Sequence, residues 1–182
     1  MEPSTTKEGK IYSYLCVRFP TTSIRGNKYI YVMYVYEFNA ILTTAMNKRR
    51  EREMISAFTY LTEDFKSRGI HPGFHLMENE ASTALNMTMT TMNIKYQLVP
   101  TSNQRANNAE RGIQTFKNHF KSGMCIVDKY FHLKLWDRLL QQTTINLNLL
   151  RKSRTFPHIS AFIHIFGELA QNFSPTWYEN IY

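Results

Sequence analysis

One segment in the second half of the chain carries side chains that could bind a phosphate backbone. Glu110, Gln114 and Lys117 are spaced by four and three residues, so in a helix they share one face. Arg105 and Arg111 lie beside them in the sequence. Such cationic and amide groups bind phosphate oxygens and position a nucleic acid without reading its sequence. If they do, log affinity should fall linearly with log salt, with a slope near −0.9 per phosphate neutralised.

Other common kinds of chemical site are not indicated. His71 and His75 have a helix-like spacing, but they flank a Pro-Gly pair, and no cysteine pair or nearby glutamate completes a tetrahedral zinc site. Cys16 and Cys125 are too few for a disulfide framework and fit a reducing compartment. The sequence also lacks a phosphate-binding glycine-rich loop and a Gly-x-Ser-x-Gly nucleophile elbow.

The composition is that of a folded chain whose positive charge either attracts a polyanionic partner or is simply solvated, as in many small basic proteins. Hydrophobic residues make up 43% of the 182 residues, which excludes wholesale disorder. Lys and Arg number 22 against 14 Asp and Glu, a formal charge of +8 that favours a nucleic-acid partner. No apolar run approaches the roughly 20 residues of a membrane span, and residues 1–10 lack the apolar core of a signal peptide. We therefore expect an intracellular protein, nuclear or cytoplasmic.

The hydrophobic pattern predicts five strands, at residues 11–17, 28–36, 40–46, 74–77 and 96–99. Residues 28–36 are aromatic and β-branched without polar alternation, which is typical of a central strand covered on both faces. Short turns at 25–27 and 37–39 join the first three strands into an antiparallel meander.

Helices are predicted from the charged run 47–53 to Arg68, at 81–92, from Ala109 through Phe120, at 133–150 and at 160–166. The charged run is interpreted as a solvated first turn, and residues 101–108 as a polar, flexible connection. The leucine-rich helix 133–150 has the spacing of a packed helix pair, and its extra leucines indicate burial on two sides or a subunit contact.

This order of elements predicts an α/β fold: a mixed five-stranded sheet, with a three-strand meander followed by strand–helix alternation, and helices on both faces. The predicted organisation is a disordered tail at 1–10, a core domain at 11–152, and a C-terminal helix and tail at 153–182.

Three ordered segments resemble the catalytic core of retroelement (retroviral-type) integrases. The segment 12–30 is similar to the first hairpin of that core, and 77–82 (MENEAS) is similar to the junction that holds its second acid. The segment 107–117 (NNAERGIQTFK) is similar to the helix with the third acid. The resemblance runs from about Ile11 to Gly167.

The resemblance implies an RNase H-like fold and metal-assisted transfer of DNA strands. Such chemistry uses two Mg²⁺ (or Mn²⁺) ions about 3.5–4 Å apart, held by three carboxylates. Glu78 and Glu110, 32 residues apart, are the implied catalytic and metal-binding residues. The resemblance also places a DNA-contacting lysine at Lys117, in a predicted DNA-binding set of Arg105, Asn107, Arg111, Gln114 and Lys117.

The triad departs from the family pattern at two positions. Tyr14 stands at the first acid, and Glu78 replaces the second Asp. A tyrosine phenol is neutral at pH 7, with a pKa near 10, and is a poor Mg²⁺ ligand. A replacement acid is Glu37, if the hairpin turns near Gly26 and sets Tyr14 opposite position 38. Without the resemblance, Glu78 and Glu110 would be surface carboxylates near helix starts.

The sequence thus predicts an integrase-core-like protein of retrotransposon origin that binds DNA and is catalytically impaired. One alternative is an active metal-dependent transferase or nuclease that uses Glu78, Glu110 and Glu37. Another is a protein-interaction scaffold that dimerises through its helices, such as the leucine-rich 133–150.

Overall fold

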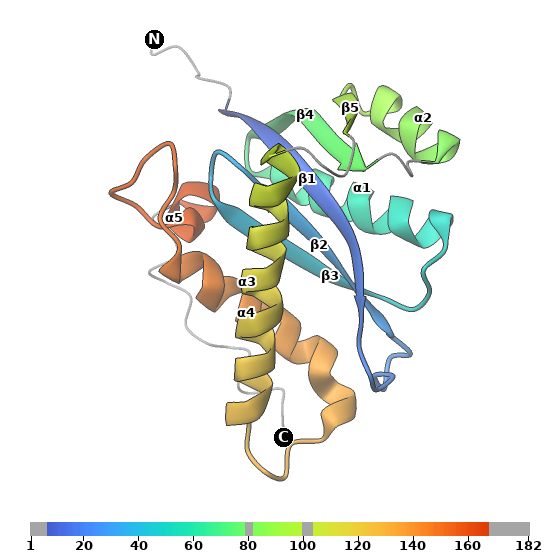
Figure 1. Cartoon of the computed structure of the whole chain (residues 1–182), viewed down its shortest axis with the longest axis vertical. Coiled ribbons are helices and arrows are strands. Elements are labelled where there is room, and N and C mark those ends of the chain that lie inside the picture. The colour runs from blue at the N-terminus through green and yellow to red at the C-terminus, as the bar shows by residue number, and fades with distance from the viewer. Residues whose placement is uncertain (1–6, 79–81, 100–103, 168–182) are drawn as a thin grey trace.

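The computed structural model describes residues 7–78, 82–99 and 104–167 and contains one mixed sheet with helices on both faces (Figure 1). Its strands are β1 (Lys7–Arg18), β2 (Tyr29–Val35), β3 (Ala40–Met46), β4 (Ile70–Glu78) and β5 (Lys95–Val99). The helices are α1 (Glu51–Ser67), α2 (Thr83–Thr91), α3 (Gln104–Ile126), α4 (Trp136–Leu150) and α5 (Ala161–Phe166), and a 3₁₀ turn at Leu133–Leu135 precedes α4.

The strand order is β3-β2-β1-β4-β5. The first three strands are antiparallel, whereas β4 pairs parallel to both β1 and β5. The predicted meander followed by strand–helix alternation is therefore confirmed, and the fold is the predicted mixed α/β sheet.

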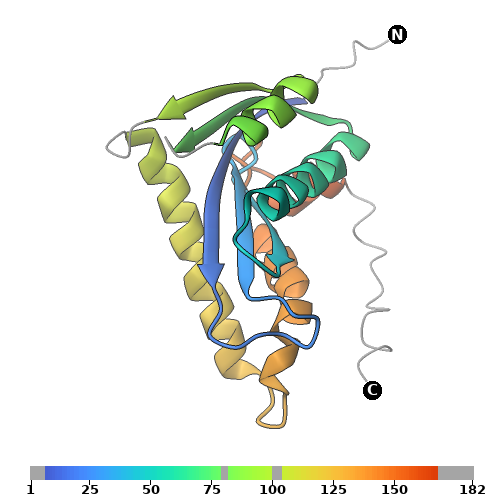
Figure 2. The same ribbon diagram turned by 90° about the vertical axis from the view of Figure 1, so that its right-hand side faces the viewer.

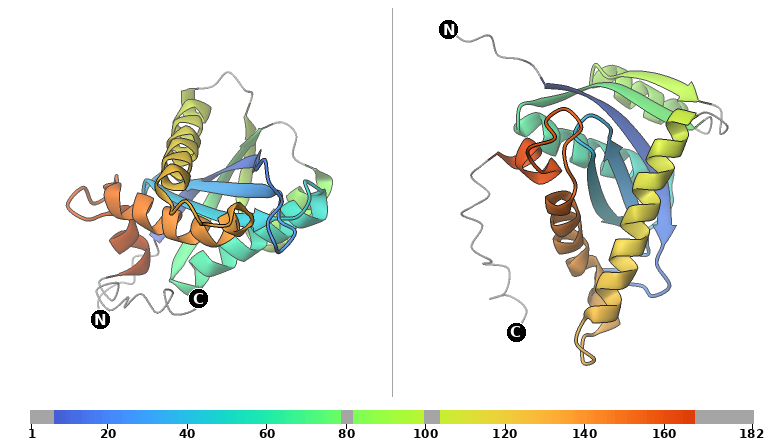
Figure 3. Two further views of the ribbon diagram at one scale, coloured as in Figure 1. Left: turned by 90° about the horizontal axis from the view of Figure 1, so that it is seen from below. Right: turned by 60° about the vertical axis from the view of Figure 1, so that its left-hand side comes forward.

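Strand β2 alternates its side chains between two cores, as expected for a strand covered on both faces. Tyr31, Met33 and Val35 enter the core that α1, α2 and α5 cover. Ile30, Val32 and Tyr34 enter the opposite core, under α3 and α4. Figures 2 and 3 show the two layers of helices on either side of the sheet.

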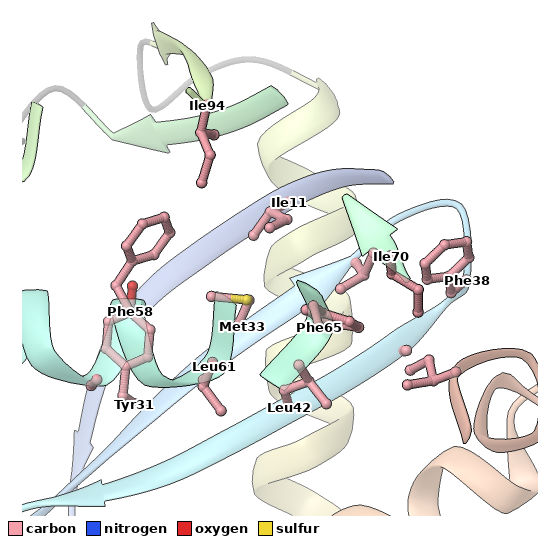
Figure 4. Close-up of a cluster of buried hydrophobic side chains, with 14 of the residues drawn as sticks. Ile11, Tyr31, Met33, Phe38, Leu42, Phe58, Leu61, Phe65, Ile70 and Ile94 are labelled. Atoms are coloured by element: carbon pink, nitrogen blue, oxygen red, sulfur yellow. The ribbon is translucent and has the colours of Figure 1, made fainter. Parts of the chain in front are cut away.

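The core under α1 is built from the apolar stripe that the sequence indicates. Phe58, Leu61 and Phe65 of α1 are buried against the sheet (Figure 4). Helix α5 adds Ala161 and Ile165 to the same core. The part of 153–182 that the structure describes thus packs onto the predicted core domain.

Helix α4 covers the open edge of the sheet at β3. The buried Asn148 side chain accepts a hydrogen bond from the Ile41 amide (2.9 Å) and donates one to its carbonyl (2.7 Å). An edge strand exposes unpaired backbone groups. The side-chain amide of Asn148 therefore satisfies the N–H and C=O of Ile41, which would otherwise need water or another strand as partner. Of the predicted leucine-rich seam, Trp136, Leu140 and Leu147 are buried, whereas Leu133 and Leu150 at its ends are exposed.

The predicted starts of β1, β4 and α3 are wrong. Strand β1 begins at Lys7, inside the predicted disordered tail, because Lys7–Gly9 pair with Ile70–Pro72 of a longer β4. Helix α3 begins at Gln104, inside the predicted flexible connection. Residues 1–6 and 168–182 lie outside the described residues. Among the described helices, none combines the length and apolar character of a membrane span.

Candidate nucleic-acid and metal site

The first two triad positions, 14 and 78, lie on the neighbouring parallel strands β1 and β4. The paired register of β1 and β4 ends at Tyr12 and Leu76, two residues before positions 14 and 78. Neighbouring strands lie about 4.8 Å apart. The two strands therefore leave their paired region at the same level of the sheet, each two residues before one of these positions.

Helix α3 brings the third position to the same part of the sheet. Gly112 packs on Tyr34 of β2: a Cβ at Gly112 would lie 3.1 Å from Cδ2 of that ring. Tyr34 in turn pairs with Tyr12 of β1. Glu110 is two residues before Gly112, so the helical turn that carries it crosses the sheet close to the level of Tyr12.

The described part of this site has no acidic cluster. Glu110 is exposed, and no basic side chain of the described residues lies within 4 Å of its carboxylate. No group of three His, Cys, Asp or Glu suited to a metal ion occurs among the described residues. The side chains of Tyr14 and Glu78 lie outside the described ones. Tyr14, Glu78 and Glu110 together are the donor set that the family pattern implies.

That donor set does not fit a pair of Mg²⁺ ions. Mg²⁺ requires hard oxygen ligands in near-octahedral geometry, and two dications need several carboxylates to neutralise them. Position 14 supplies a phenol in place of a carboxylate, and positions 78 and 110 supply two glutamates. The longer side chain at position 78 also shifts its carboxylate relative to an aspartate by more than about 1 Å.

The predicted role of Glu37 rests on a register that is wrong. Position 14 pairs with Val32 rather than with position 38. Residues 19–28 form a long connection, and at its base Phe19 N–H donates to Lys28 O (2.8 Å). The register between β1 and β2 shifts after Tyr14. Glu37 therefore stands five residues beyond the partner of position 14, roughly 15 Å along the sheet. Its Oε2 accepts the Lys10 amide at 2.6 Å instead.

The predicted DNA-contacting residues occupy one helix. Arg111 and Gln114 are exposed on α3, and Lys117 is half-buried. Gln114 Nε2 donates to Asn118 Oδ1 at 2.9 Å. Arg105 and Asn107 fall within the first turns of α3, and their side chains lie outside the described ones. No carboxylate of the described part lies within 4 Å of Arg111 or Lys117, so both charges are available to an anion.

Two arginines that the sequence analysis did not single out, Arg151 and Arg154, hold side chains and backbone at the β2–β3 turn. Arg154 lies 4.2 Å from the centroid of the Tyr36 ring, and its Nη2 donates to the Tyr34 hydroxyl at 3.1 Å. Arg151 donates through Nε to the Asn39 carbonyl (2.7 Å) and through Nη2 to the Asn39 side chain. Burial lowers the pKa of Arg151. The basic segment 151–154 is visible in the sequence, but nothing there indicates which strand it meets.

No protein-family model and no curated protein matches the chain. Several solved structures match it. The catalytic core of HTLV-2 integrase in complex with magnesium superposes with a TM-score of 0.63 at 16% identity, over 88% of this chain and 97% of that one. The catalytic core of BIV integrase gives 0.64 at 9% identity, over 89% and 96%.

A third match is to the simian T-cell lymphotropic virus intasome in complex with the PP2A regulatory subunit B56 gamma. Its TM-score is 0.66 at 12% identity, over 90% of this chain and 56% of that one. Such identities establish architecture and leave chemistry to be argued from the residues. The chain has the RNase H-like fold of retroviral integrase catalytic cores.

Proposed function

We propose that this chain is an integrase-core-like protein of retroelement origin that binds DNA and does not carry out efficient strand transfer. The observation that supports this proposal is the parallel pairing of β1 and β4, the two strands that carry positions 14 and 78. At these positions the chain has tyrosine and glutamate where the family has two aspartates.

Retained DNA binding is supported by charge. The chain has a formal charge of +8, and Arg111, Gln114 and Lys117 stand on α3 without carboxylate partners in the described part. Contacts from these side chains to phosphates do not need a metal ion. Loss of catalysis and retention of binding are therefore compatible in one site.

A pair of assays on one labelled duplex tests the proposal. Wild-type protein should bind the duplex, with an affinity that falls as salt rises, and should leave it uncleaved and unjoined in Mg²⁺ or Mn²⁺. Lys117→Gln should weaken binding, and Lys129→Gln, which removes an exposed charge from the α3–α4 connection, should not. Cleavage by the wild type that Glu110→Gln abolishes would favour the active-enzyme alternative.

Self-association is a second candidate function, and the exposed apolar C-terminal end of α4 favours it. Leu149 and Leu150 are 48% and 75% exposed, and Tyr60 of α1 is 59% exposed. A scaffold that dimerises through helices would use such side chains. Absence of DNA binding at low salt, together with a dimer in sedimentation that Leu149→Lys/Leu150→Lys disrupts, would support this function over the first.

A further inference from the structure

A second basic surface lies at the end of the sheet where β1 turns into β2. It comprises seven exposed residues, here called the hairpin patch: Arg18, Arg25, Lys28, Lys48, Arg49, Arg50 and Arg52. Three come from residues 18–28, at the end of β1 and in the β1–β2 connection, and four from residues 48–52, in the β3–α1 connection and the first turn of α1. Sequence reasoning assigned the second group to a solvated helical turn and gave the first no role.

Tertiary contacts join the two connections into one surface. Lys28 N donates to Met46 O at 2.9 Å. A Cβ at Gly26, whose φ is +83°, would lie 3.6 Å from Oδ1 of Asn47. Both connections lie at the same end of the sheet in Figure 1. Residues some 25 apart in sequence therefore present their charges side by side.

Most of the excess charge of the chain is concentrated here. The segments 18–28 and 47–53 contain these seven basic residues and two acids, Glu51 and Glu53, a formal +5 out of +8. Glu53 Oε2 accepts the Lys48 amide at 2.7 Å. Asp137, which also reaches this end of the sheet, is buried and accepts a hydrogen bond from Asn27 Nδ2 at 2.8 Å.

No ion pair among the described residues accounts for these cations. Within the described residues, no carboxylate lies within 4 Å of any of the seven, and the ion pair that is present joins Arg68 to Asp64 on α1. Clustered like charges repel one another and destabilise the folded chain. A polyanion bound across them would replace repulsion with attraction.

The position and the residue types favour a nucleic-acid backbone. Arg18 lies four residues beyond position 14 on β1, about 13 Å along the strand. One turn of duplex DNA is about 34 Å long, so a duplex bound at the candidate site is long enough to reach the patch. Five of the seven residues are arginines, whose planar fork suits phosphate oxygens.

We propose that the hairpin patch is a second, sequence-independent contact surface for the phosphate backbone of duplex DNA held at the candidate site. This inference rests on the proposed function, because it extends the path of the same DNA. It adds a site that includes neither α3 nor the triad positions.

Fluorescence anisotropy of a labelled duplex, titrated with the full chain at several salt concentrations, tests the patch. Arg25→Gln/Arg49→Gln takes one charge from each connection and should weaken binding about tenfold or more, with the log–log salt slope reduced by about 1.8. Lys129→Gln/Lys152→Gln removes the same charge from exposed sites outside the patch and should leave the slope unchanged. Arg18→Gln/Lys28→Gln is an independent pair that should reproduce the first result.

The outcomes separate the two proposals. If the wild type binds but both patch pairs retain its slope and affinity, the hairpin patch is refuted and the proposed function stands. If the wild type does not bind at low salt, the proposed function fails and the patch fails with it.

Ile24 at the hairpin tip is 65% exposed, so binding to anionic vesicles is measured as a second arm of the experiment. Loss of vesicle binding with unchanged DNA binding in the patch variants would refute the DNA surface in favour of a lipid one.

Discussion

Gly112 of α3 lies directly against the ring of Tyr34 in β2, with 3.1 Å between the position of a Cβ and Cδ2 of the ring. The ring has little freedom to move away. Its hydroxyl donates to Asn39 Oδ1 at 3.0 Å and accepts from Arg154, whose guanidinium covers Tyr36. This contact sets the height of α3 over the sheet, and with it the place of Glu110 two residues earlier.

Gly112→Ala should therefore destabilise the protein by about 1 kcal/mol. Alanine gains about 1 kcal/mol of helix propensity, but overpacking against the held ring costs about 1–3 kcal/mol. Urea unfolding measures the change. The matched control is Gly123→Ala in the same helix, where a Cβ would meet Thr143 Oγ1 at an ordinary 3.9 Å. Gly123→Ala should stabilise, and equal effects at both positions would contradict the close contact.

Asn148→Asp should cost about 2–4 kcal/mol. The carboxylate keeps an acceptor for the Ile41 amide but loses the Nδ2 donor to the Ile41 carbonyl. It also buries a charge at a site that is 1% exposed. Thermal unfolding measures the loss. Asn146→Asp, an exposed site on the same helix whose Oδ1 accepts from Gln142, should stay within about 0.5 kcal/mol of the wild type. A tolerated Asn148→Asp would show that α4 does not cap the β3 edge.

His75 should make stability fall in mild acid. Burial lowers the pKa of this histidine to about 3, from 6.5. Below pH 6.5 His75 of the unfolded chain becomes protonated, whereas His75 of the folded protein stays neutral down to about pH 3. The free energy of unfolding should therefore decrease as pH falls through this window, by up to about 1.4 kcal/mol per pH unit.

Comparison of pH slopes isolates this contribution. The ring of His75 stacks on Phe58 at 5.0 Å, so His75→Phe keeps an aromatic group there and should flatten the slope between pH 6.5 and 3. His71→Gln changes an exposed histidine of the same strand and should leave the slope as it is. An unchanged slope in His75→Phe would mean that other groups cause the acid sensitivity.

The sequence predicts the fold well where local pattern and tertiary pairing agree. Strand β3 has the predicted bounds, Ala40–Met46, because its apolar run is framed by turn residues. The start of β4 at Ile70 could not be predicted, since Pro72 and Gly73 read as a break. Pairing with Lys7–Gly9 sustains the strand there, and its register shifts directly afterwards, between Gly9 and Lys10.

The candidate site was less predictable because it depends on register. The motifs identified Glu78 and Glu110, and the backbone brings their segments together with β1. The partner of position 14 depended on the shape of the 19–28 connection, where Ser23 N–H bonds Asn27 O (2.9 Å) and shifts the centre of the hairpin toward its first strand. Because of this shift, Tyr14 pairs with Val32, and Glu37 lies away from the candidate site. The hairpin patch, too, exists only through contacts between two connections.

Calorimetric titration of Mg²⁺ into the full chain tests most directly the proposal that its residues do not form a site for Mg²⁺. The wild type should show no saturable binding in the millimolar range, whereas Tyr14→Asp/Glu78→Asp, which restores the acids of the integrase pattern alongside Glu110, should bind Mg²⁺ saturably. Saturable binding by the wild type that Glu110→Gln abolishes would contradict that proposal.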